Sequence, residues 1–304
     1  MKTQRILLGG LTLIFLTVFL TLFVGCGGGG SGSTSSTPLV NGTISGTAIK
    51  GPVANATVTC FSINADGTKG NMIGTGQTDG QGNYSIPVGD YSGAVLCQMT
   101  GGNYMDEATG INMPMLQNEV MTCVIPSMSA GSIVSGIHMT PLTSMAQMMA
   151  QNMPGGMTSL NITGANNAVG NYFMVNDILH TQPMNPAING SGTAADQNMR
   201  NYGMTIAAMS QYANMVGMPN SSGMVTSMMN DASDGYMNGM MGTSGIMMGG
   251  GMMGGVMMSP NAGTSGLANA MMQFIQSPMN KSGVTVQDMQ SLINKLMTSN
   301  GAIQ

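Results

Sequence analysis

The pattern of hydrophobic and polar positions changes once along the chain, from a period of two residues to a period near 3.6. From residue 41 to about residue 126, short runs rich in β-branched residues alternate apolar and polar positions, as half-buried strands do. Turn-forming pairs separate these runs, among them Asp66-Gly67, Asp79-Gly80 and Gly101-Gly102. The expected strands lie in NGTISGTAIKG, NATVTCFSI, NYSIPV, AVLCQM and EVMTCVIP. This spacing predicts a small antiparallel β-sandwich.

From about residue 138 the apolar positions recur at helical spacing. In the segment 194–217, for example, Met199, Tyr202, Ile206 and Met209 fall on one helix face. Other helices are expected within 140–151, 164–175, 267–277 and 285–297, the last opened by Thr285 and Asp288 in capping-box spacing. The chain is therefore predicted to be α+β, with a sandwich at 41–127 and a separate Met-rich helical region at 128–304 that contains a Gly/Met loop at 237–262.

The first 40 residues have the pattern of an export signal and a tether. Lys2 and Arg5 precede an apolar run, Leu7 to Val24, which ends at Gly25-Cys26. A small residue followed directly by Cys resembles a bacterial lipobox, so residues 1–25 are predicted to be a lipoprotein signal peptide and Cys26 the lipidated first residue. The alternative is a plain transmembrane anchor, because the run is long enough to span a bilayer. Residues 26–40 are rich in Gly and Ser and predict a flexible tether.

Charge narrows the choice of partners. Only 6% of the 304 residues are charged, and removal of the signal would leave five cations against eleven anions. Nucleic-acid binding needs several cations on one face, so a nucleic-acid partner is not expected. Gly27 follows Cys26 where a sorting Asp would retain the protein at the inner membrane, so we expect a lipid anchor in the outer membrane, facing the periplasm or the surface. An envelope protein is the expected partner.

Three cysteines remain besides Cys26. In two runs expected to be strands, Cys60 shares a face with Val58, and Cys97 shares a face with Val95. A Cys60–Cys97 disulfide is predicted on this basis, and it suits an oxidising compartment. The alternative is that all three cysteines are buried free thiols.

The segment from Ser45 to Val88 resembles the carboxypeptidase regulatory-like domain, a transthyretin-type β-sandwich. The resemblance rests on a G-x-V-x-x-A-x-V segment and a T-D-x-x-G-x-Y turn, formed here by Gly51, Val53, Ala56, Val58, Thr78, Asp79, Gly82 and Tyr84. GGNYMDEATG and HMTPLTSMAQMMA are also similar to segments of bacterial lipoproteins that join such a sandwich to a helical region. The resemblance implies surface display and a structural or binding role without catalysis. In the turn, we expect Asp79 to accept backbone N–H groups while Gly80 and Gly82 adopt positive φ.

Residue types that support catalysis are sparse. Asp106 and Glu107 are adjacent and would face opposite ways on a strand, so we expect a solvated turn rather than a catalytic carboxylate pair. His138 and His180 lie outside any nucleophile motif, and the Gly-rich strings lack the strand-to-helix context of a phosphate-binding loop. The chain is therefore expected to be neither an enzyme nor a protein with a resident cofactor.

Methionine supplies the one alternative chemistry. The chain has 38 Met, and thioethers are soft ligands that favour Cu(I). The candidate ligands are Met240, Met241, Met247, Met248, Met252, Met253, Met257 and Met258. The competing interpretations are a hydrophobic interaction loop and sacrificial oxidation to the sulfoxide, because Met also fills apolar positions elsewhere in the chain. The sequence thus predicts a lipid-anchored structural or binding module of the cell envelope, with copper binding as the alternative.

Overall fold

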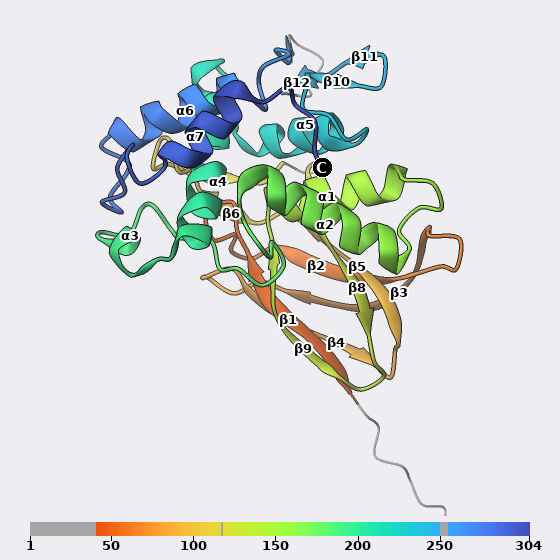
Figure 1. The fold of residues 1–304 in the computed structure, drawn as a ribbon. Helices are drawn as coiled ribbons and strands as arrows, with labels where there is room; N and C mark the ends of the chain where they lie inside the picture. Colours follow the sequence, from red (N-terminus) through yellow and green to blue (C-terminus); the bar gives the residue numbers. More distant parts are fainter. Residues whose placement is uncertain (1–40, 117, 250–254) are drawn as a thin grey trace, which may run out of the picture. The chain divides into compact units, whose positions relative to one another are not determined.

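The computed structural model describes residues 41–116, 118–249 and 255–304, and its strands precede its main helices along the chain (Figure 1). The α+β class predicted from the sequence is confirmed. The described residues form one compact unit. The predicted signal peptide and the predicted tether, with Cys26, lie outside the described residues.

Two sheets form the N-terminal half. The first has the order β4-β1-β9, with bounds Asn83–Gly89, Gly42–Ala48 and Ile133–Met139. The second has the order β3-β2-β5-β8, with bounds Lys69–Gln77, Thr57–Ile63, Gly93–Thr100 and Val120–Met128. Most neighbouring strands are antiparallel, as expected, but β1 and β9 pair in parallel. Because β9 belongs to the first sheet, the strands continue past residue 127, where the sequence had suggested a boundary.

Every second side chain of a strand points into the space between the two sheets and helps to fill it. In β4 the buried residues are Tyr84, Ile86 and Val88, and the residues between them are exposed. They share one core with Val58 and Cys97 of the second sheet. The turn before β4 is only partly as expected. The Asp79 carboxylate accepts the N–H groups of Gln81 and Asn83, and Gly82 has φ +81°, but Gly80 does not adopt positive φ.

Seven helices occur in the described residues. Their bounds are α1 Pro141–Asn152, α2 Ser159–Phe173, α3 Ser191–Ala194, α4 Gln197–Met215, α5 Ser222–Ala232, α6 Ser265–Gln276 and α7 Gln290–Thr298. Thr140 begins α1 with a capping box to Thr143, and Pro141 occupies its first turn. The sequence pattern found five of the seven and missed α3 and α5.

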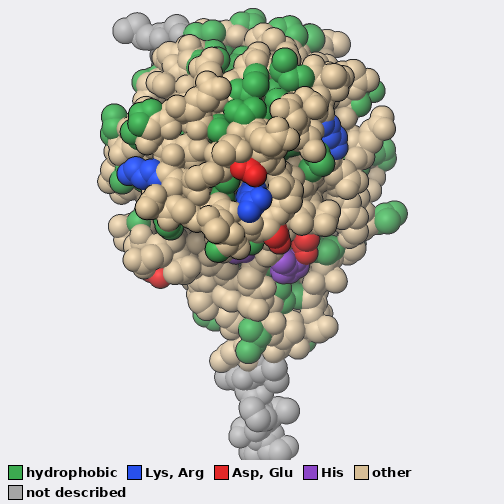
Figure 2. Space-filling view, turned by 60° about the vertical axis from the view of Figure 1, so that its left-hand side comes forward, with side chains coloured by type: hydrophobic (Ala, Val, Ile, Leu, Met, Phe, Trp, Pro, Cys, Tyr) green, Lys and Arg blue, Asp and Glu red, His purple; other side chains and the backbone are tan. Residues whose placement is uncertain are grey.

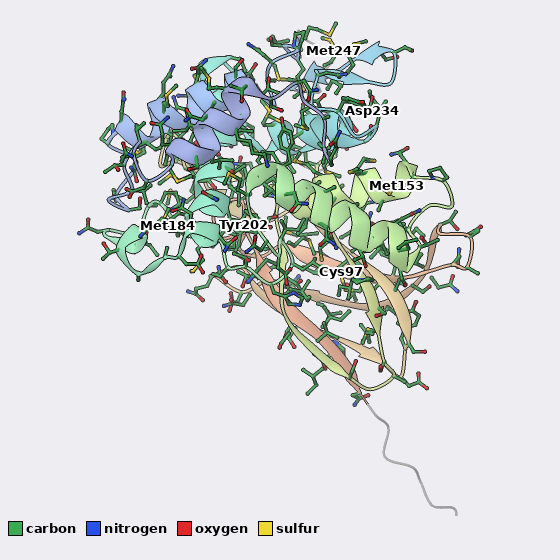
Figure 3. All side chains as sticks on the ribbon, in the orientation of Figure 1. Cys97, Met153, Met184, Tyr202, Asp234 and Met247 are labelled. Atoms are coloured by element: carbon green, nitrogen blue, oxygen red, sulfur yellow. A yellow bond between two sulfur atoms is a disulfide. The ribbon has the colours of Figure 1, made fainter. Side chains whose placement is uncertain are left out.

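Helices α1 and α2 pack on the outer face of the four-stranded sheet. Leu96 of β5 and Val124 of β8 point away from the space between the sheets and join the same core as α1 and α2. The Tyr202 hydroxyl of α4 lies 2.7 Å from the Thr140 hydroxyl and donates to the Ile178 carbonyl at 2.8 Å (Figure 3). Strands and helices are therefore continuous in packing, and the helical region is separate only in sequence order.

Short hairpins complete the described structure. Strands β6 (Asn103–Met105) and β7 (Asn112–Pro114) pair with each other. Within the expected Gly/Met loop, two-residue strands pair as β10 with β11 and as β12 with β13, with bounds Met240–Met241, Ser244–Gly245, Met247–Met248 and Val256–Met257. Among the described residues, no helix is long and apolar enough to cross a membrane.

Candidate functional site

A lysine that is completely buried marks the candidate site. Lys50 follows β1 in a tight turn and has no exposed side-chain surface. The turn needs Gly51, which has φ +63° and whose Cβ, if present, would lie 2.3 Å from the Met105 carbonyl oxygen. This close approach places Lys50 against the β6–β7 hairpin.

The ammonium group of Lys50 has a full set of partners. It donates to Glu107 Oε2 at 2.9 Å, to Ser221 Oγ at 3.0 Å and to Ser210 Oγ. Asp106 Oδ2 lies 3.9 Å away, and the ring of Tyr104 is centred 4.9 Å from Nζ. We call these six residues the Lys50 cluster: Lys50, Tyr104, Asp106, Glu107, Ser210 and Ser221.

The two carboxylates are not solvated, contrary to the sequence-based expectation. The exposed fractions of Asp106 and Glu107 are only 2% and 7%. The expected local turn does form, because Asp106 Oδ1 accepts from the N–H and the hydroxyl of Thr109 at 2.9 and 2.8 Å. The helices α4 and α5 then cover the turn, which a pattern of neighbouring residues could not reveal.

Each serine of the cluster bridges the amine to one carboxylate. The Ser210 hydroxyl, on α4, donates to Glu107 Oε2 at 2.6 Å, and the hydroxyl of Ser221, the residue directly before α5, donates to Asp106 Oδ2. The Tyr104 hydroxyl lies 3.1 Å from Ser221 Oγ. The cluster therefore joins the β1–β2 turn and the β6–β7 hairpin to two helices more than 100 residues away.

The charges within the cluster compensate one another. Burial acts to lower the pKa of Lys50, but attraction to Glu107, Tyr104 and Asp106 outweighs it and leaves the pKa above its ordinary value. Lys50 is therefore a cation at neutral pH. A serine nucleophile would need a neutral amine as its base, and the resting cluster does not provide one.

Two adjoining clefts reach the cluster from outside. One encloses about 250 Å³ between the Lys50 turn and residues 182–186, and the other about 730 Å³ beside the β6–β7 hairpin. Glu107 lines both clefts, and Asp106 lines the second. The two acidic residues thus form part of the cleft walls, whereas Lys50 lines neither cleft.

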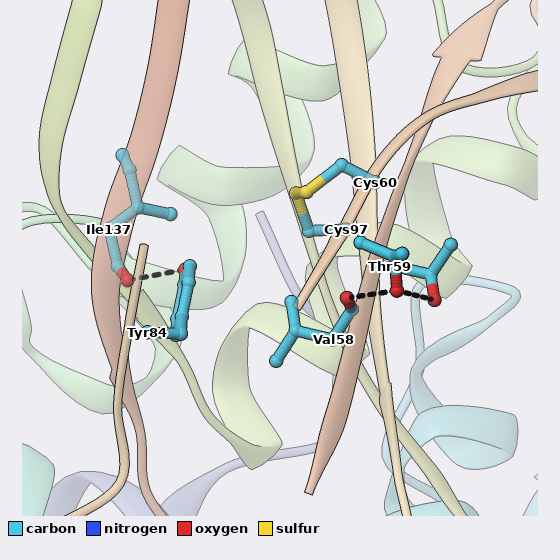
Figure 4. The surroundings of a disulfide bond; sticks show 7 residues. Val58, Thr59, Cys60, Tyr84, Cys97 and Ile137 are labelled. Carbon is cyan, nitrogen blue, oxygen red and sulfur yellow. Dashed lines mark hydrogen bonds between the residues drawn. A yellow bond between two sulfur atoms is a disulfide. The ribbon is translucent and has the colours of Figure 1, made fainter. Parts of the chain in front are cut away.

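The cysteines form a row across three neighbouring strands. Cys60 of β2 is paired with Cys97 of β5, and Cys97 with Cys123 of β8, all on the face between the sheets. Cys60 and Cys97 form a disulfide with Cα atoms 4.1 Å apart (Figure 4), as the strand pattern had suggested, and Cys123 is a buried free thiol. Burial raises the pKa of Cys123 to about 12, so its thiol stays protonated. Across the core, Tyr84 donates to the Ile137 carbonyl at 2.7 Å (Figure 4).

The described candidate copper ligands are divided between the core and the surface. Met248 and Met258 are core residues, while Met240, Met241, Met247 and Met257 are exposed. Met252 and Met253 lie outside the described residues. Met247 and Met257 are directly opposed across β12 and β13, and Met247 lies far from Cys97 (Figure 3). In the part of the chain that the structure describes, no group of three His, Cys, Asp or Glu side chains is placed to hold a metal ion.

Other ionisable groups are buried singly. Burial lowers the pKa of His138 to about 4, with His180 nearby adding to the effect, and raises the pKa of Asp231 to about 6. His180 itself is exposed and its Nδ1 lies 2.8 Å from Asp177 Oδ2.

Sequence reasoning missed Lys50, although the signal was present. Ile44 and Ala48 of β1 face the core, and the same alternation carries on to residue 50. A lysine at an inward position requires a buried partner of opposite charge. No protein family, no curated protein and no solved structure matches this chain.

Proposed function

We propose that the chain is a lipid-anchored, non-catalytic module of the bacterial cell envelope, held at the outer membrane by Cys26 and acting as a spacer or a binding surface. The sequence of the first 40 residues supports the anchor. The observation that carries most weight is the Cys60–Cys97 disulfide, because structural disulfides persist in oxidising compartments such as the bacterial periplasm.

The Lys50 cluster supports a structural role. Its ammonium group and both carboxylates are engaged with one another, and they join segments that are distant in sequence. The surface also suits contact with uncharged partners. The face in Figure 2 consists mostly of uncharged polar and backbone atoms, with apolar side chains between them and few charged groups.

Incorporation of a palmitate analogue tests the anchor. In a Gram-negative host, the full chain should be labelled and recovered with outer membranes, and Cys26→Ser should abolish both. Cys123→Ser serves as the matched cysteine control and should leave the labelling unchanged. Equal labelling of the full chain and Cys26→Ser would refute the proposal.

Copper binding is the second candidate function. It is favoured by Met247 and Met257, whose exposed side chains lie on one face of β12–β13. Competition of residues 39–304 against a Cu(I) chelator provides the test, with Met247→Leu/Met257→Leu compared with the exposed control Met72→Leu. Affinity weaker than micromolar, or unchanged in the double variant, would reject this candidate.

A further inference from the structure

We infer that Lys50 and Asp106 become joined by an intramolecular amide bond in the folded chain, with Glu107 as the base for the reaction. This inference goes beyond the proposed function and does not depend on the lipid anchor. It rests on the placement of an amine, two carboxyl groups and two bridging hydroxyls within one buried cluster.

Asp106 has the surroundings of an electrophile. Its Oδ1 accepts from the Thr109 N–H at 2.9 Å and from the Thr109 hydroxyl at 2.8 Å. Two fixed donors on one carboxyl oxygen stabilise the negative charge that develops there when a nucleophile attacks the carbon. The other oxygen, Oδ2, accepts from Ser221 and is the oxygen that leaves.

Glu107 has the position of a base. Its Oε2 lies 2.9 Å from Lys50 Nζ, within hydrogen-bond reach of the proton that must be removed. The Ser210 hydroxyl, at 2.6 Å, fixes that oxygen. Lys50 Nζ lies 3.9 Å from Asp106 Oδ2, which places the amine beside the carboxyl group that it attacks.

The reaction is a condensation, and its atoms balance within the cluster. Transfer of the ammonium proton to Asp106, through Glu107 or Ser221, gives a neutral amine and a carboxylic acid without changing the net charge. Nζ then bonds to the Asp106 carboxyl carbon, and the bond from that carbon to Oδ2 breaks. The amine gives up one more proton, which Glu107 takes and passes to the departing oxygen. One amide and one water molecule result, Glu107 ends as a carboxylate, and nothing is oxidised or reduced.

The neutral amine and acid are a minor state of the cluster, because the attraction of Lys50 to Glu107, Tyr104 and Asp106 outweighs burial and keeps the amine protonated at rest. Condensation draws on this minor state, so the reaction is expected to be slow. The released water can leave by the larger cleft, whose wall includes Asp106 and Glu107. Lys50 itself has no exposed surface, and the Tyr104 ring is centred 4.9 Å from its amine.

Intact-mass measurement of the purified disulfide-bonded chain tests the inference. The expected mass is lower by one water molecule than the mass of the same disulfide-bonded chain without the amide, and proteolysis should release a branched peptide that joins Lys50 to Asp106. Glu107→Gln should slow formation of the branched peptide by roughly 100-fold or more, because it removes the base while keeping the size of the side chain. Lys50→Met and Asp106→Ala should abolish it.

The matched control is Lys281→Met, which removes an exposed lysine at the edge of the larger cleft and should leave the branched peptide unchanged. Circular dichroism checks that each variant is folded. A folded parent chain whose mass shows no loss of water would overturn the inference. So would a loss of water that persists in Lys50→Met, because this would locate the dehydration at Asp106 alone, as a cyclic imide.

Discussion

Replacing Lys50 with Met leaves two buried carboxylates without their cation. The resulting decrease in the free energy of unfolding is the most informative prediction. At 2.9 and 3.9 Å and an effective dielectric constant of about 20, the attractions to Glu107 and Asp106 are about 6 and 4 kcal/mol before desolvation is subtracted. Loss of one partner of a buried ion pair typically costs about 3–5 kcal/mol. Relative to a parent chain in which the cluster is still an ion pair, we expect Lys50→Met to lower the free energy of unfolding by this amount at pH 7.

The decisive comparison is with the triple variant Lys50→Met/Asp106→Asn/Glu107→Gln. This variant buries no net charge, so it should recover most of the lost stability, about 2–4 kcal/mol at pH 7. Neither variant has the Lys50 amine, so the difference between them is independent of any amide bond. Lys281→Met, on the surface, should cost less than about 0.5 kcal/mol.

The pH dependence has a definite sign. In Lys50→Met the two carboxyl groups are buried without a cation, and burial favours their neutral, proton-bound form more in the folded state than in the unfolded chain. The stability of that variant should therefore fall as pH rises, and the gap to the triple variant should shrink by on the order of 1 kcal/mol per unit from pH 7 to pH 5. Urea unfolding followed by circular dichroism measures both quantities. Equal stabilities of the two variants at pH 7 would show that the carboxylates are solvated through the clefts, and would refute the reasoning.

Three further predictions concern groups outside the cluster. The Cys60→Ala/Cys97→Ala variant should lose about 4 kcal/mol, since the bridge spans 37 residues, whereas Cys123→Ala should lose about 1 kcal/mol; equal urea midpoints would contradict this. Asp231→Asn should be more stable than the parent by on the order of 2 kcal/mol at pH 7 and equal to it below pH 4, because a folded pKa near 6 makes the parent lose stability as pH rises from about 4 to 6. The parent should also lose stability as pH falls from 6.5 to about 4, because burial lowers the pKa of His138, and His138→Gln should remove this loss. For either variant, a profile of melting temperature against pH that is unchanged from the parent's would exclude the assignment.

Much of the fold could be predicted because its pattern is local. Alternation in β4 and the capping residues of α1 are readable from neighbouring positions, and the helix faces follow from spacing. Helix α5 was missed because its first turn lies directly after Gly217 and Pro219, which were interpreted only as the end of the preceding helix. The parallel pairing of β9 with β1 was missed because it depends on a contact between residues about 90 positions apart.

The candidate site was harder to predict for a related reason. Asp106 and Glu107 have the local signature of a solvated turn, and their burial depends on Ser210 and Ser221, which are over 100 residues away. The methionines show the reverse relation between sequence and structure, and copper binding by them stays a prediction. Their clustering in sequence suggested a common site, but adjacent residues on short strands point to opposite sides, and so Met247 is exposed where Met248 is buried.

The mass of the N-terminal peptide of the membrane-extracted protein tests the central claim most directly. Our account predicts a peptide that begins at Cys26 and carries covalently attached fatty acyl groups. A peptide that begins at Met1, or a mature chain that begins elsewhere without acylation, would contradict it.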